Sequence, residues 1–174
     1  MKRGIRYMWI TVLILAAVLA AVLAALLATP LGDRPLAALF PVGAVAPVDF
    51  AGVSLSDQPN QFLICPEQMC RAERHAVSPV FEVPVERLAA RWREVIAAQP
   101  RLEVLAEGPN GLHFDYVQRS ARFRFPDLVT VRLIPLSPER STLAVYSRAL
   151  YGGEDFGVNR QRVEAWIELL GTAR

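Results

Sequence analysis

The feature that most constrains this chain is an apolar run from Met8 to Ala28, in which Thr11 is the only polar side chain. As a helix rising about 1.5 Å per residue, the run is roughly 30 Å long, which matches the hydrocarbon core of a bilayer. No acidic residue precedes the run, and three basic residues do: Lys2, Arg3 and Arg6. Basic flanks stay on the cytoplasmic side, so we expect a single-pass signal anchor in the inner (plasma) membrane with the N-terminus inside.

A cleaved signal peptide is the alternative interpretation of this run, because basic residues precede it and small residues lie near Ala25 to Thr29. The apolar region of a signal peptide is usually about 7 to 15 residues long, so the greater length here favours an uncleaved anchor. Under both interpretations the rest of the chain lies in the periplasm or outside the cell.

The exported part of the chain is nearly neutral. Without Lys2, Arg3 and Arg6, the 19 basic residues fall to 16, against 17 acidic residues. Nucleic-acid-binding proteins usually present a concentrated basic surface to phosphates. The charge balance therefore argues against a nucleic-acid partner.

Residues 29–55 are rich in proline, glycine and alanine, which disfavour regular structure, and we interpret them as a tether. The predicted organisation has a cytoplasmic stub and transmembrane anchor over residues 1–28, this tether, and a domain over residues 56–174. The last segment is long enough for one small core.

Hydrophobic periodicity predicts two helices in the domain. The first begins at Pro84, ends before Pro100 and has one apolar face, formed by Leu88, Trp92, Val95 and Ile96. The second begins near Asn159, ends at Gly171 and has a similar face, formed by Val163, Trp166, Ile167 and Leu170.

Short runs of β-branched and aromatic residues predict strands over Val80–Val83, Leu102–Ala106, Leu112–Val117, Ala121–Phe125, Val129–Leu136 and Thr142–Ser147. We expect an α+β two-layer sandwich, with an antiparallel sheet of about four to five strands and two helices packed on one face. One N-terminal transmembrane helix precedes it.

Cys65 and Cys70 are the only cysteines of the chain, and an oxidising compartment favours a disulfide between them. A zinc site with His75 and His113 is an alternative, although the spacing matches no standard zinc finger. Two free thiols are a third interpretation. We expect neither a metal nor a cofactor.

Catalytic motifs are missing from the sequence. It has no Gly-x-Ser-x-Gly elbow, P-loop, dinucleotide fingerprint or His-Glu-x-x-His. An enzyme is therefore the less favoured interpretation, and we assign no catalytic residue. The enzymatic alternative is a hydrolase that uses Asp155 or Asp127 with His113.

The stretch from Tyr146 to Arg162 is dense in arginine, glycine and acidic residues. It resembles the C-terminal signature of domain-of-unknown-function family 1499, in which a strand ending Ser-x-Ser-Arg leads through Gly, Asp and Gly to Asn-Arg-x-Arg-x-Glu. The positions that match are Ser147, Arg148, Gly152, Asp155, Gly157, Asn159, Arg160, Arg162 and Glu164.

Two further segments are similar to the same family. Cys65, Pro66 and Cys70 resemble its Cys-Pro motif and following cysteine, although Met69, Arg71 and Ala72 depart from the pattern. Phe125, Pro126 and Asp127 resemble its Phe-x-Asp. The resemblance covers about residues 56–172 and implies a shared fold and an envelope location, without an established activity.

The signature predicts an anion site at the start of the last helix, formed by Arg148, Asp155, Asn159, Arg160 and Arg162. Helix N-termini present free amides, and arginine binds carboxylate or phosphate with two parallel hydrogen bonds. The group would belong to an anionic small molecule or a lipid headgroup. The alternative is that Asp155, Asp127 or Glu164 pair with the arginines and hold the loop against the helix, with Arg160 and Glu164 one turn apart.

Three functions follow as hypotheses. The first is a membrane-anchored binding or scaffolding module of the cell envelope. The second is the hydrolase described above. The third is a structural partner of another membrane protein, which predicts an exposed apolar patch or a transmembrane helix face that is sensitive to residue exchange.

Overall fold

The computed structural model describes residues 2–28, 37–70 and 74–172, and the chain divides into two units. Residues 1–41 with 122–124 form the first, and residues 42–121 with 125–174 form the second. The first contains helix α1 (Lys2–Ala28), whose segment Tyr7–Ala25 has a mean hydropathy of 2.7. By length and composition α1 can cross a membrane once, a property that N-terminal signal sequences share.

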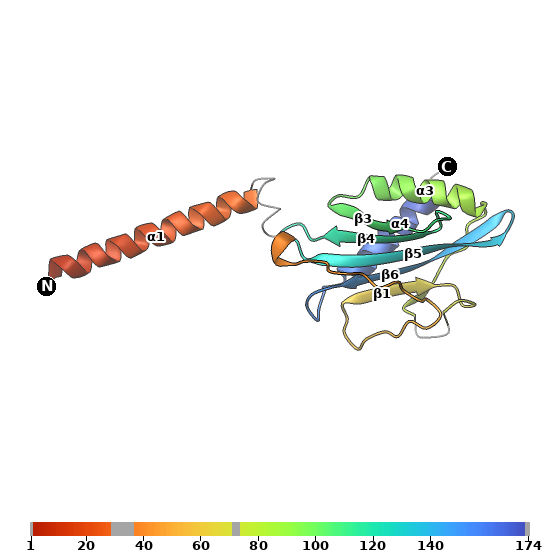
Figure 1. Ribbon diagram of the computed structural model, residues 1–174, viewed down its shortest axis with the longest axis horizontal. Coiled ribbons are helices and arrows are strands. Elements are labelled where there is room, and N and C mark those ends of the chain that lie inside the picture. The colour runs from red at the N-terminus through yellow and green to blue at the C-terminus, as the bar shows by residue number, and fades with distance from the viewer. Residues whose placement is uncertain (1, 29–36, 71–73, 173–174) are drawn as a thin grey trace. The chain divides into compact units, whose positions relative to one another are not determined.

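A six-stranded sheet forms the centre of the second unit within the described residues. Its strands are β1 (Gln61–Cys65), β2 (Ala76–Val77), β3 (Leu102–Glu107), β4 (His113–Arg119), β5 (Pro126–Ser137) and β6 (Arg140–Ala149). Their order across the sheet is β2-β1-β6-β5-β4-β3, and only the β1–β2 pair is parallel (Figure 1).

Helices α3 (Val85–Ala97) and α4 (Val158–Thr172) pack on one face of this sheet (Figure 1). Their predicted apolar faces meet in the core, where Trp92 and Trp166 form an edge-to-face pair with ring centroids 5.7 Å apart. The indole nitrogen of Trp92 donates to the buried hydroxyl of Tyr116 at 2.9 Å. The predicted α+β sandwich is confirmed, with one or two strands more than expected.

The other face of the sheet, which we call the back face, is covered by irregular chain. Phe50 is buried there against Leu63, Tyr146 and the cysteine pair, with Val48, Val53 and Leu55 around it. Phe50 and the three partly buried residues around it thus belong to the second unit, although residues 29–55 are predicted to form a tether. A proline- and glycine-rich segment has no periodicity, so its sequence does not reveal that one phenylalanine is buried.

Several strands differ from the predictions. Val80–Val83 forms only an isolated bridge, in which Phe81 and Ser141 exchange backbone hydrogen bonds. The Ala121–Phe125 segment is a turn that connects β4 to β5, and Arg124 within it has a left-handed φ of 58°. Arginine and phenylalanine alternate in this segment, and the same polar–apolar alternation is typical of a strand. Strands β1 and β2 were not predicted, because β1 is a short run that is buried throughout and shows no alternation.

Candidate functional site at the start of helix α4

Asp155 caps the first turn of helix α4. Its Oδ1 accepts a hydrogen bond from the amide of Gly157 at 2.9 Å, and its Oδ2 accepts one from the amide of Asn159 at 2.8 Å. The loop reaches this geometry through left-handed φ angles of 55° at Phe156 and 77° at Gly157. The protein's own carboxylate therefore satisfies these two amides, which were predicted to bind an external anion.

Asn159 is fully buried and connects α4 to two other segments. Its Nδ2 donates to the carbonyl of Asn60 at 3.0 Å and to Oδ2 of Asp155 at 2.7 Å. Its Oδ1 accepts a hydrogen bond from the hydroxyl of Ser147 on β6 at 2.6 Å. Asn159 thereby joins the helix to the sheet and to the chain ahead of β1.

Arg162 is the centre of a buried network on the helix side of the sheet, with only 7% of its side chain exposed. Its Nε donates to Gln118 at 2.6 Å, and its Nη1 donates to Ser147 at 2.9 Å and to Asn159 at 2.5 Å. Its Nη2 donates to Asp127 at 2.5 Å. Burial raises the pKa of Asp127 above its usual value, and the Arg162 charge offsets this only in part.

Arg148 lies on the back face, away from Arg162, because it alternates with the helix-facing Ser147 along β6. Its guanidinium stacks over the ring of Tyr146, 4.8 Å from the centroid, and its buried Nη1 has no hydrogen-bond partner in the described residues. Burial lowers the pKa of Arg148, against the opposing effects of Tyr146 and Asp115. The predicted convergence of Arg148, Arg160 and Arg162 is therefore wrong.

Arg160 is the exposed arginine of the three, with 66% of its side chain accessible. Its Nε is 2.8 Å from Oε1 of Glu164, and its guanidinium lies 5.7 Å from the ring centroid of Phe62. Together with His75 and Asp155 it lines an open hollow of about 280 Å³. The alternative prediction of internal ion pairs is confirmed for Arg160 with Glu164 and for Arg162 with Asp127.

His75 contributes to the same hollow from the segment before β2. Its Nδ1 accepts a hydrogen bond from the amide of Leu63 at 3.1 Å, and its own amide donates to the carbonyl of Leu63 at 2.9 Å. Burial, followed by the nearby charge of Arg160, lowers the pKa of His75 below its usual value. While the imidazole is neutral, it thus accepts a backbone hydrogen bond from β1 that a neighbouring strand would otherwise accept.

The hydrolase hypothesis requires His113 beside Asp127 or Asp155, and the structure does not bring these residues together. His113 lies on the back face, where its Nε2 is 3.1 Å from Oδ2 of Asp115. The Oδ1 of Asp115 accepts a hydrogen bond from the hydroxyl of Thr130 at 2.7 Å. Asp127 is on the opposite face, where it binds Arg162.

Cys65 and Cys70 form a disulfide with a Cα–Cα distance of 6.0 Å, as predicted. Both thiols are consumed, so the structure does not offer them as zinc ligands with His75 and His113. The bond closes the loop Pro66–Met69, which is also held by a hydrogen bond from the amide of Cys70 to the carbonyl of Pro66 at 3.2 Å.

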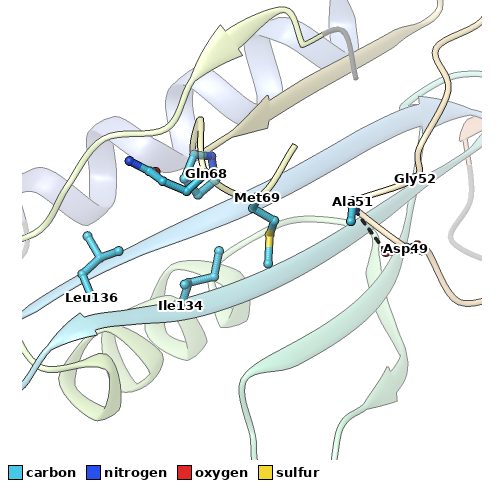
Figure 2. Close-up of a pocket in the computed structure, with 8 residues that line it drawn as sticks. Asp49, Ala51, Gly52, Gln68, Met69, Ile134 and Leu136 are labelled. Carbon is cyan, nitrogen blue, oxygen red and sulfur yellow. Dashed lines mark hydrogen bonds between the residues drawn. The ribbon is translucent and has the colours of Figure 1, made fainter. Parts of the chain in front are cut away.

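The disulfide loop forms one wall of a groove on the back face, with a volume of about 560 Å³. Figure 2 shows Met69 extending from this loop over the sheet beside Ile134, with Leu136 farther along β5 and Ala51 on the other side. Sequence reasoning missed the groove, because its walls come from three segments that share no motif.

Comparison with curated proteins finds no match to this chain. A family model described as "Protein of unknown function (DUF1499)" matches residues 53–170. That range contains all six strands and both sheet-packed helices, apart from the last two residues of α4. The match confirms the resemblance seen in the signature from Ser147 to Glu164, and the chain belongs to the DUF1499 family.

Proposed function

We propose that this protein is a membrane-anchored binding module of the cell envelope, held by α1 with its N-terminus inside and its domain in the periplasm or outside the cell. The apolar length of α1 and the basic residues ahead of it support the anchor. The disulfide supports an oxidising compartment.

A pair of C-terminal fusions tests this topology. An alkaline phosphatase fusion is expected to be active and a green fluorescent protein fusion dark, and the opposite result would contradict the proposal. The mass of the membrane-extracted chain separates the two N-terminal interpretations: an intact mass supports the anchor, whereas loss of about the first 28 residues supports a cleaved signal.

The binding site in this proposal is the hollow lined by Arg160 and His75, and its ligand carries a small anionic group such as a phosphate or carboxylate. The observation that carries it is the exposed Arg160–Glu164 pair. An exposed ion pair contributes little stability, so a stronger acceptor can replace Glu164 at low cost. Arg162 is committed to its internal network, and Asp155 to the helix amides.

Phosphate titration followed at the His75 ring by NMR tests the site in the full chain. A bound anion stabilises the imidazolium, so phosphate is expected to raise the pKa of His75. Arg160→Gln should abolish this response, whereas Arg140→Gln, at an exposed arginine where β6 begins, should preserve it. An unchanged pKa of His75 at saturating phosphate would contradict the anion site.

One observation favours the structural-partner function as a second candidate. Phe156 is 86% exposed, and the hydrogen bond from its amide to Glu154 at 3.1 Å helps to hold the loop that presents it. Phenylalanine is among the residues enriched in the cores of protein interfaces, so an exposed ring held on this loop suits a protein contact. Cross-linking in native membranes should capture one envelope protein with the wild type and lose it with Phe156→Ser, while the phosphate response of His75 remains.

A further inference from the structure

The back-face groove continues into a second hollow of different character. The two hollows share Met69 and Ile134 in their walls, and the second has a volume of about 490 Å³. The first is lined mostly by apolar side chains (Figure 2), whereas the second adds His113 and Arg132. One continuous surface is thus apolar along one part and cationic along the other.

Arg132 provides the charge of the second hollow. It is exposed on β5 directly across from His113 on β4, and within the described part of the chain it makes no ion pair or side-chain hydrogen bond. The nearest acid in the register, Asp115, is already bonded to His113 and Thr130. The guanidinium therefore keeps its donors for an external acceptor.

The apolar part suits a flexible hydrocarbon. Met69 is an adaptable side chain of the kind common at binding surfaces, and Ile134 and Leu136 supply the aliphatic floor on β5. Asp49 also lines the groove, on the side of Met69 opposite to Leu136 (Figure 2), and its Oδ1 accepts a hydrogen bond from the amide of Ala51 at 3.0 Å. That carboxylate repels a second anionic group, so the groove favours a ligand with one charged end.

From this geometry we infer that the groove binds a single-chain fatty acid, with its carboxylate on Arg132 and its chain between Met69, Ile134 and Leu136. A carboxylate carries one charge and matches one planar guanidinium with two parallel hydrogen bonds. A phosphate monoester carries a charge of about −2 at pH 7, which Arg132 alone does not neutralise. The site is separate from the Arg160 hollow and adds a second ligand to the proposed function.

Photo-cross-linking of the full chain in zwitterionic lipid nanodiscs tests this site, with a diazirine-bearing dodecanoate as the probe. Mass spectrometry should locate the adducts on peptides that contain Met69 or Ile134 and Leu136. The methyl ester of the same probe has no charge and should label these peptides at least tenfold less. Adducts that lie mainly elsewhere, or equal labelling by the ester, would overturn the inference.

Variants separate the contributions of charge and shape. Arg132→Gln should reduce labelling about tenfold, as expected for the loss of a charge-assisted hydrogen bond. Ala51→Trp should reduce it by filling the groove. The matched surface variant Arg140→Gln should label like the wild type, and all three should keep the wild-type unfolding midpoint.

The Arg160→Gln variant distinguishes this site from the anion site. It should abolish the phosphate response of His75 and leave dodecanoate labelling unchanged, so either site can fail without the other. Equal labelling of Arg132→Gln and Arg140→Gln, or loss of labelling in Arg160→Gln, would contradict the groove as the fatty-acid site.

Discussion

Nη2 of Arg162 lies 2.5 Å from Oδ2 of Asp127, so a residue of helix α4 is paired with a residue of β5 that is 35 positions away. Both side chains are almost completely buried, at 7% and 10% exposure. The pair belongs to a network with Gln118, Ser147 and Asn159 that holds the last helix on the sheet.

Arg162→Met is expected to lower the free energy of unfolding by about 3–5 kcal/mol, because it leaves Asp127 buried without its partner. Arg160→Met, which breaks the exposed pair with Glu164, should cost less than about 1 kcal/mol. Guanidinium unfolding measures both values. The double variant Arg162→Met with Asp127→Leu should lose less than Arg162→Met alone, and equal losses for Arg162→Met and Arg160→Met would refute the role of the network.

Asp155→Ala is expected to lower the free energy of unfolding by about 1–2 kcal/mol, since the amides of Gly157 and Asn159 lose their acceptor. The adjacent Glu154→Ala removes only an exposed contact to the amide of Phe156 and should change it by less than about 0.5 kcal/mol. Thermal and denaturant unfolding of the two variants give the comparison. Similar losses would show that Asp155 does not act as the cap.

The pH dependence of stability should include a contribution from His75. Its folded pKa is lowered, so the unfolded chain binds a proton first as the pH falls through the usual value near 6.5. Stability is therefore fully present above this pH and decreases as the pH falls toward the folded pKa. His75→Gln should remove that part of the slope between pH 7 and pH 5, and an NMR titration should place the ring pKa below 6.5.

Reduction of the disulfide is expected to lower the free energy of unfolding by about 2 kcal/mol, the chain-entropy value for a loop with a separation of five residues. Unfolding with and without a reductant measures the difference. The variant Cys65→Ala with Cys70→Ala supplies the control, because its unfolding should not respond to the reductant. A reductant effect of the same size in this variant would assign the change to another cause.

Local patterns explain the predictions that succeeded. The apolar faces around Trp92 and Trp166 repeat at the helical period, and a residue four positions from another on a helix lies beside it, as Arg160 does with Glu164. The disulfide joins the only two cysteines of the sequence, which are five residues apart. These features depend on short sequence separations, so a single stretch of sequence contains the information.

The sequence by itself determined the apolar helix, the two amphipathic helices, most of the hairpin strands and the family signature. Only the tertiary structure decided that Arg148 and Arg162 lie on opposite faces of the sheet, that Asp127 rather than a ligand pairs with Arg162, and that Phe50 is buried on the back face. Side chains alternate between the two faces of the sheet along β6, and the rotation of α4 about its axis determines which of its side chains point to the sheet. The pairing of distant strands then determines which of these faces come into contact. Such contacts depend on the packing of the whole chain, which no local pattern records.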